Sequence, residues 1–177
     1  KEIPQLNDYA LSKWVNEQQI RNSQKLFDTK TVIVRIFNTY GPGEYYHPYR
    51  SVNSKFCYNL LHGNKIDLYA GHKRTSTFLE DSVTTIANIA DNFKAGEVYN
   101  IGGSELHTIE ELAELILGKT LASRSLVKVH NHQEFLTTKD KLVDVSKSVR
   151  DLGHKNSVSL EEGVSRTVDW MRSVYNV

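Results

Sequence analysis

The sequence predicts an α/β fold with a parallel sheet, and three observations support this prediction. Runs rich in β-branched residues, such as residues 31–37, alternate along the chain with segments whose apolar residues recur at helical spacing. The nearly continuous apolar run at 31–37 is typical of a strand that is buried on both faces of a parallel sheet. The 177 residues, of which 39% are hydrophobic, are sufficient for one compact domain with a hydrophobic core.

The first predicted helix covers residues 8–27, and Asn7 or Asp8 is its expected N-cap. Tyr9 and Lys13 are one helical turn apart, so their side chains project from the same face of this helix.

The predicted strand at 31–37 leads to Asn38 and then to a turn at Gly41-Pro42-Gly43. Ligands of open α/β sheets bind at the carboxyl ends of the strands. Asn38 is therefore a candidate ligand-binding amide, although an asparagine in a loop also commonly caps its own turn.

The remaining elements are predicted from the same kinds of pattern. They are a helix at 52–62, strands at 66–69, 75–79 and 98–101, a helix capped by Asp81, a strand at 126–131 and a helix at 144–152. Thr108-Ile-Glu-Glu111 and Ser159-Leu-Glu-Glu162 are capping boxes that begin two further helices, and Gly118 is expected just beyond the first of them.

Composition excludes several classes of function. The net charge of +1, with acids and bases interspersed, does not suggest a nucleic-acid partner. No apolar run approaches the roughly 20 residues of a membrane span, and Lys1-Glu2-Ile3-Pro4 shows no signal-peptide pattern. The single cysteine, Cys57, is expected to be a buried apolar residue in a reducing compartment. We therefore expect a cytoplasmic protein without a membrane partner.

Two histidines raise the question of a metal site. His130 and His132 share one face of a predicted strand with Lys128, and no third ligand is evident. We expect this face to be solvated and predict no metal site.

The Tyr9 and Lys13 pair is a candidate acid/base site. A free tyrosine has a pKa of about 10 and is a poor base at neutral pH, but an ammonium group one helical turn away favours the tyrosinate. The spacing alone also arises by chance, as Tyr69 and Lys73 demonstrate. That second pair contains a glycine and lies between predicted strands, so the helical context favours Tyr9 and Lys13.

Arginine and lysine side chains in loops are candidates for binding an anion. Arg74, which follows His72 and Lys73, is the strongest candidate, while Arg50 and Lys55 are equally well explained as solvated surface charges.

Together, these segments resemble those of the extended short-chain dehydrogenases/reductases that act on nucleotide sugars. This family includes 4-epimerases, 4,6-dehydratases and related decarboxylases. The resemblance covers essentially the whole chain, and the segments that carry it are Tyr9-x-x-x-Lys13, Arg35-Ile-Phe-Asn38-Thr-Tyr-Gly41-Pro42, Tyr49-Arg-Ser-Val52, Lys73-Arg74 through Phe78-Leu-Glu-Asp81, Tyr99-Asn-Ile-Gly-Gly103, Asp144-Val-Ser-Lys147, Leu152-Gly-His154 and Leu160-Glu-Glu-Gly163 with Trp170.

The resemblance implies roles for individual residues. Tyr9 and Lys13 are implied as the catalytic pair, and both are implied to bind the cofactor together with Phe37. The implied cofactor is NAD rather than NADP, and the implied substrate is a nucleotide-diphosphate sugar. The residues implied to bind this substrate are Asn38, Arg50, Val52 and Arg74.

The resemblance also implies an architecture. Residues 1–43 are expected to end a Rossmann-like cofactor-binding domain, and 44–177 are expected to form mainly a smaller α/β substrate-binding lobe. Within the second range, residues 81–103 are expected to return to the cofactor domain. The helix that carries Tyr9 is implied to lie at the interface of a homodimer.

Two departures from the family pattern matter. The chain contains no Gly-x-x-Gly-x-x-Gly dinucleotide motif, so we expect it to be the C-terminal part of a longer enzyme and to be inactive in isolation. The family's arginine before Asp144 is replaced by Phe135-Leu-Thr-Thr-Lys139, in which Lys139 is the candidate substitute. The sequence leaves epimerase, dehydratase and decarboxylase open. A non-catalytic relative that binds nucleotide sugars, or a reductase of a non-sugar substrate, are the alternatives.

Overall fold

The computed structural model describes residues 7–177 and confirms the predicted α/β fold. Residues 1–4, where the sequence shows no signal-peptide pattern, lie outside the described residues. Along the chain the elements are α1 (Asp8–Phe27), β1 (Ile33–Ile36), β2 (Thr39–Tyr40), α2 (Val52–Leu61), β3 (Ile66–Tyr69), β4 (Lys73–Thr75), β5 (Thr77–Phe78), α3 (Leu79–Asp91), β6 (Val98–Ile101), β7 (Leu106–Thr108), α4 (Ile109–Thr120), a 3₁₀ turn (Arg124–Leu126), β8 (Val127–His130), β9 (Asp140–Lys141), α5 (Ser146–Leu152) and α6 (Leu160–Tyr175).

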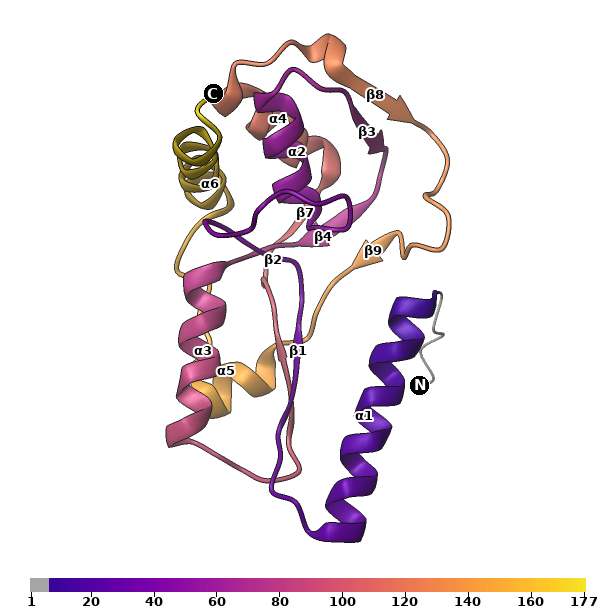
Figure 1. The fold of residues 1–177 in the computed structure, drawn as a ribbon, viewed down its shortest axis with the longest axis vertical. Helices are drawn as coiled ribbons and strands as arrows, with labels where there is room; N and C mark the ends of the chain where they lie inside the picture. The colour runs from indigo at the N-terminus through magenta and orange to yellow at the C-terminus, as the bar shows by residue number, and fades with distance from the viewer. Residues whose placement is uncertain (1–6) are drawn as a thin grey trace.

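The lower half of the molecule in Figure 1 is built on a parallel pair of strands. β1 pairs with β6, with Ile33 opposite Val98, and α5 packs against β6 and against α3. The prediction that the first strand is buried on both faces is wrong, because Ile36 is 53% exposed and Arg35 is half-exposed in an ion pair with Glu17. The physical reason is that, among the described residues, β6 is the strand that pairs with β1, so β1 lies at the edge of a two-stranded sheet.

The upper half of the molecule contains the main hydrophobic core. α2, α4 and α6 pack against one another, and the parallel pair β3–β8 lies beside them (Figure 1). Cys57 is fully buried among these helices, and burial raises the pKa of its thiol to about 12, so the prediction of a buried cysteine is confirmed. Other core side chains are Phe56, Leu60, Leu112, Ile116, Val164, Val168 and Met171.

Short strands join the two halves. β4 pairs antiparallel with β7 and parallel with β9, while β2 pairs parallel with β5. β2 follows β1 closely in the chain, and β5 leads directly into α3. This junction places residues 38–40 next to residues 75–78, and both segments lie between the two halves (Figure 1).

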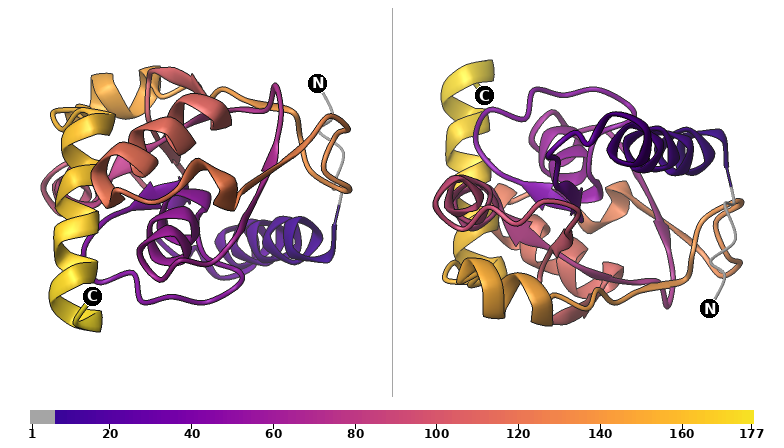
Figure 2. Two further views of the ribbon diagram at one scale, coloured as in Figure 1. Left: turned by 90° about the horizontal axis from the view of Figure 1, so that it is seen from above. Right: turned by 90° about the horizontal axis from the view of Figure 1, so that it is seen from below.

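The helix α1 stands apart from the rest of the molecule. It lies towards one edge in both views of Figure 2, and none of its residues is buried within the part of the chain that the structure describes. At its beginning, Asn7 Nδ2 donates a hydrogen bond of 3.2 Å to the backbone oxygen of Leu136, in the segment between β8 and β9. The apolar side chains of Leu11, Trp14 and Val15 are between 40% and 49% exposed. The outer face of α1 therefore lacks a packing partner among residues 7–177.

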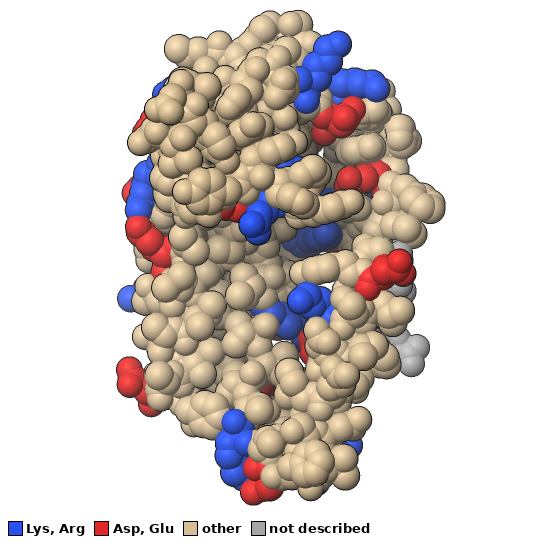
Figure 3. Space-filling model, viewed as in Figure 1, with Lys and Arg blue, Asp and Glu red and all other residues tan. Residues whose placement is uncertain are grey.

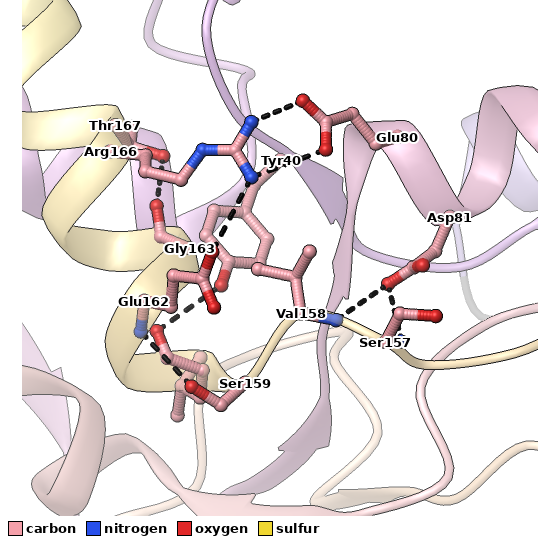
Figure 4. Close-up of polar contacts among 11 residues, drawn as sticks. Tyr40, Glu80, Asp81, Ser157, Val158, Ser159, Glu162, Gly163, Arg166 and Thr167 are labelled. Carbon is pink, nitrogen blue, oxygen red and sulfur yellow. Dashed lines mark hydrogen bonds and ion pairs between the residues drawn. The ribbon is translucent and has the colours of Figure 1, made fainter.

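The role predicted for Asp81 is wrong. The helix α3 begins at Leu79, so Asp81 lies within its first turn rather than at its N-cap. The carboxylate instead accepts hydrogen bonds from the backbone nitrogens of Ser157, at 3.0 Å, and Val158, at 3.2 Å (Figure 4). Asp81 therefore fixes the turn that precedes α6 to the beginning of α3.

The predicted capping boxes have different outcomes. Thr108 and Glu111 form the complete reciprocal box, which confirms that prediction. At the second site, Ser159 Oγ accepts from the backbone of Glu162, but the Glu162 carboxylate lies 3.6 Å from Arg166 instead of bonding back to the cap (Figure 4). The expectation that α4 ends before Gly118 is also wrong, because the helix continues to Thr120.

Candidate functional site

A cleft of about 1030 Å³ lies between the beginning of α1, the end of β1 and the upper half of the molecule. Figure 3 shows basic side chains gathered in the hollow beside α1. The sequence-predicted site residues that line this cleft are Tyr9, Phe37, Asn38, Arg50, Val52 and Arg74, and Lys55 lines it as well. The structure therefore brings together candidates from α1, the end of β1, the loop before α2, α2 itself and β4.

Tyr9 and Lys13 share a face of α1, as their spacing predicts. Asn7 Oδ1 accepts a hydrogen bond of 2.9 Å from the backbone nitrogen of Ala10, so Asn7 caps the helix that carries both residues. Lys13 Nζ lies 5.5 Å from the centroid of the Tyr9 ring. Tyr9 lines the cleft and is 73% exposed, which leaves its hydroxyl accessible to a ligand.

Asn38 occupies a backbone conformation that L-residues seldom adopt, with φ of 45°. Its side-chain nitrogen donates a hydrogen bond of 2.9 Å to the backbone oxygen of Thr75, and its own backbone oxygen accepts from Thr77. The alternative that Asn38 caps its own turn is therefore not what the structure contains. The side chain ties the end of β1 to the strand that carries Arg74 and lines the cleft at this point.

Arg74 is a buried cation at the wall of the cleft, with 6% of its surface exposed. Its Nη1 donates to the backbone oxygens of Lys73 and Lys139, both at 2.8 Å, and its Nη2 lies 3.2 Å from His72 Nδ1. A guanidinium only donates hydrogen bonds, so Nδ1 of His72 is the acceptor of this contact. Burial lowers the pKa of Arg74, and no carboxylate within residues 7–177 forms an ion pair with it.

The loop before α2 is organised by Glu44. The Glu44 carboxylate accepts from the backbone nitrogen of Ser51, at 3.0 Å, and from its hydroxyl, at 2.9 Å. Ser51 in turn caps α2 by accepting from the backbone nitrogen of Ser54. These bonds position Val52 at the first turn of α2 and Arg50, whose Nε donates to the Tyr45 backbone oxygen at 3.3 Å, at the mouth of the cleft.

Sequence reasoning missed further residues of the cleft. Lys141 lines the cleft, whereas the predicted substitute, Lys139, contributes its backbone oxygen to Arg74 and places its side chain beside Gly71. His72 also lines the cleft and is almost completely buried. Its position two residues before Arg74 was the available signal, because alternate residues of an extended segment share a side.

The solvated face predicted for the two histidines is only partly correct. His132 and Lys128 are exposed, but His130 Nε2 lies 2.6 Å from Asp67 Oδ1 and its ring stacks on Tyr69, with centroids 4.8 Å apart. Asp67 and Tyr69 line the cleft, so His130 contacts two of the residues that form its wall. Within residues 7–177, no group of three His, Cys, Asp or Glu side chains is placed to hold a metal ion.

No helix within residues 7–177 is both long and apolar enough to cross a bilayer.

Comparison with known families gives the relationship directly. The sequence model of the NAD dependent epimerase/dehydratase family matches residues 1–102. The chain belongs to this family. The match includes Tyr9, Lys13, Asn38 and Arg74, and the family is defined by its dependence on NAD.

Individual relatives agree with this assignment. The chain is 30% identical over 177 residues to the UDP-N-acetyl-alpha-D-glucosaminuronate decarboxylase of Bacillus cytotoxicus, and the match covers 95% of the chain and 54% of that enzyme. It is similar in structure to the epimerase Mth375 of Methanothermobacter thermautotrophicus, with a TM-score of 0.89 and 26% identity, over 99% of the chain and 53% of the epimerase.

A third relative is the dTDP-glucose 4,6-dehydratase of Streptomyces venezuelae, solved with NAD bound. Its TM-score is 0.83 at 30% identity, and the match covers 95% of the chain and 52% of the dehydratase. The chain therefore spans about half the length of the relatives it matches. The relatives are Rossmann-type enzymes, in agreement with the parallel strand pairs and flanking helices of this chain.

Proposed function

We propose that the chain is the C-terminal part of an NAD-dependent nucleotide-sugar epimerase or 4,6-dehydratase that oxidises the sugar transiently at C4. The observation that carries this proposal is the convergence of Tyr9, Asn38 and Arg74 on one cleft. A proton acceptor, an amide and a buried cation that has no ion-pair partner among residues 7–177 are the groups that a sugar hydroxyl and a diphosphate require.

The diphosphate is assigned to the inner part of the cleft. Arg74 is held by three acceptors within the protein, so its orientation is fixed before a ligand arrives. Asn38 reaches the same wall through its hydrogen bond to Thr75. Arg50 and Val52, at the beginning of α2, are assigned to the nucleotide. The relatives support this class of ligand, because their names specify UDP and dTDP sugars.

NAD is assigned to the open side of α1. Tyr9, Lys13 and Phe37 are the residues present that would hold it, and they fit this role because the two polar side chains share an exposed face of the helix. When bound, NAD accepts a hydride from the sugar carbon. Tyr9 would take the proton of the C4 hydroxyl as general base while the hydride leaves C4, so that the sugar becomes a ketone. Arg74 and Asn38 hold the substrate in register.

The proposed division of the chain follows from this assignment. Residues 1–43 and 81–103 belong to the cofactor domain, and most of 44–177 forms the substrate lobe. The pairing of β1 with β6 supports the return of 81–103, and the packing of α5 on β6 adds residues 146–152 to the same half. The exposed apolar face of α1 is assigned to a homodimer interface.

Binding is the first test of the proposal. Calorimetric titration of the 177-residue chain with UDP and dTDP is expected to show binding of at least one nucleotide. The Arg74→Met variant is expected to bind about tenfold more weakly, because it loses a charge-assisted contact. Arg124→Met is the matched control, because Arg124 is exposed and pairs with Glu114 on the surface. Absence of binding by the unmodified chain, or equal losses in both variants, would contradict the proposal.

Catalysis is the second test. The 177-residue chain is expected to be inactive with NAD and nucleotide sugars, because it contains no glycine-rich dinucleotide motif. A longer chain that includes these residues is expected to be active, and Tyr9→Phe is expected to lower its kcat by about 10²-fold or more with little change in KM. A Tyr9→Phe variant that keeps full activity would exclude the proposed base. A longer chain that binds nucleotide sugars without turnover would identify a non-catalytic relative.

A further inference from the structure

Lys141 and Arg74 lie in register on neighbouring strands. β9 runs parallel to β4, and the paired positions are Arg74 with Lys141 and Lys73 with Asp140. Residues in register on adjacent strands point to the same face of a sheet, and adjacent strands lie about 4.8 Å apart. The side chains of Arg74 and Lys141 therefore project in the same direction, and both line the cleft.

The two positive charges are not neutralised within the described part of the chain. Neither Arg74 nor Lys141 forms an ion pair there, although eleven other pairs of a Lys or Arg with an Asp or Glu do. Partial desolvation and then the charge of Arg74 lower the pKa of Lys141, although the residue remains exposed to solvent. The positive charges of Arg74 and Lys141 on adjacent strands repel each other, and an anion bound between them removes this unfavourable electrostatic energy.

Other charged groups face the same part of the cleft. Glu134, in the segment before β9, lines the cleft. Its negative charge offsets part of the lowering of the pKa of both Arg74 and Lys141. Asp140 has the same effect on Arg74. His72 is held against Arg74 with its acceptor nitrogen towards the guanidinium, and its pKa is lowered by burial and by Arg74. Carboxylates are therefore near the cations without closing an ion pair with either of them.

Lys139 provides a natural contrast. It is two residues from Lys141 and carries the same charge, but its contact with Arg74 is made by the backbone oxygen. Its side chain lies beside Gly71, with Cε 3.7 Å from the position that a Cβ would take there. Lys139 precedes β9 and its side chain lies at Gly71, whereas Lys141 belongs to β9 and lines the cleft.

We propose that Lys141 is the second cationic ligand of the substrate diphosphate and acts beside Arg74. The inference rests on the proposed function for the identity of the ligand and goes beyond it by assigning this residue. The diphosphate of a nucleotide sugar carries one negative charge on each of its two phosphoryl groups, and two adjacent cations match these two charges. Arg74 supplies planar, fixed donors, and Lys141 supplies a compact charge on a flexible chain that adjusts to the second phosphate.

The test compares two variants that each remove one positive charge. Calorimetric titration with UDP and dTDP is expected to show about tenfold weaker binding for Lys141→Gln and a change of less than about twofold for Lys139→Gln. Lys141→Arg is expected to retain most of the affinity, because it keeps the charge. Failure of both nucleotides to bind the unmodified chain would overturn the proposed function together with this inference. Binding by the unmodified chain with equal affinity in Lys141→Gln would overturn this inference alone.

A second measurement does not depend on a substituted protein. The pKa of Lys141 is followed by NMR through its Cε resonance in the free chain and with saturating UDP or dTDP. In the free chain the pKa is expected to be below the ordinary lysine value, and the bound nucleotide is expected to raise it. The Lys139 resonance serves as the internal control and is expected to shift little. A Lys141 pKa that is the same with and without bound nucleotide would contradict the proposal.

Discussion

Gly163 gives the most sharply defined test of the packing between α6 and the rest of the molecule. It lies in the first turn of α6, directly against the buried ring of Tyr40 (Figure 4). The buried ring of Phe78 also contacts this position. A Cβ added at this position would lie 2.9 Å from Phe78 Cδ2 and 3.0 Å from Tyr40 Cζ, and closer still to Tyr40 Oη. The Gly163→Ala change therefore forces either the helix or a buried ring to move.

The magnitude follows from two opposing effects. Overpacking of a close-packed interior costs about 1–3 kcal/mol, and the near-complete burial of both rings places this site in the upper part of that range. Alanine is a better helix former than glycine by about 1 kcal/mol, which offsets part of the cost. We expect Gly163→Ala to lower the free energy of unfolding by about 2 kcal/mol, which corresponds to a fall in Tm of roughly 4–8 °C.

Gly118→Ala is the matched control. Gly118 is an exposed glycine within α4, and an added Cβ would meet no atom within 4 Å among the described residues. This variant is expected to raise the free energy of unfolding by about 1 kcal/mol through helix propensity alone. Urea unfolding followed by circular dichroism measures both changes. Effects of the same sign in the two variants would refute the steric reasoning, because only Gly163 is packed against side chains.

Three further predictions concern buried polar groups. Asp81→Ala is expected to lower the free energy of unfolding by about 2 kcal/mol in urea titrations, because two backbone nitrogens before α6 lose their acceptor; an unchanged midpoint would contradict this role. Burial, reinforced by Arg74, lowers the pKa of His72, so its contribution to stability is present above about pH 6.5 and is lost as the pH falls through the folded-state pKa. His72→Asn is therefore expected to flatten the decline in Tm between about pH 7 and pH 5, and an unaltered pH profile would exclude His72 as its source. Cys57 is expected to react with a thiol reagent only in denaturant, because burial raises its pKa to about 12, and rapid labelling of the folded chain would disprove its burial.

Signals contained within one or two helical turns were predictable from the sequence. Thr108 and Glu111 form a capping box because both belong to the same turn, and Asn7 caps α1 for the same reason. Tyr9, Asn38 and Arg74 were identifiable as candidates because each belongs to a distinctive local segment. Their convergence on one cleft is a result of the fold.

What the sequence determined by itself was the α/β class, the positions of most helices and strands, and the residue types available for chemistry. Only the tertiary structure decided that Lys141, rather than Lys139, lines the cleft beside Arg74, because Lys141 pairs with Arg74 across β9 and β4 while the Lys139 side chain lies at Gly71. It also assigned Asp81 to backbone nitrogens 76 and 77 positions further along the chain. The physical reason is the range of the interactions. A helix cap is specified by neighbours within one turn, whereas register, burial and charge compensation depend on which distant segments meet.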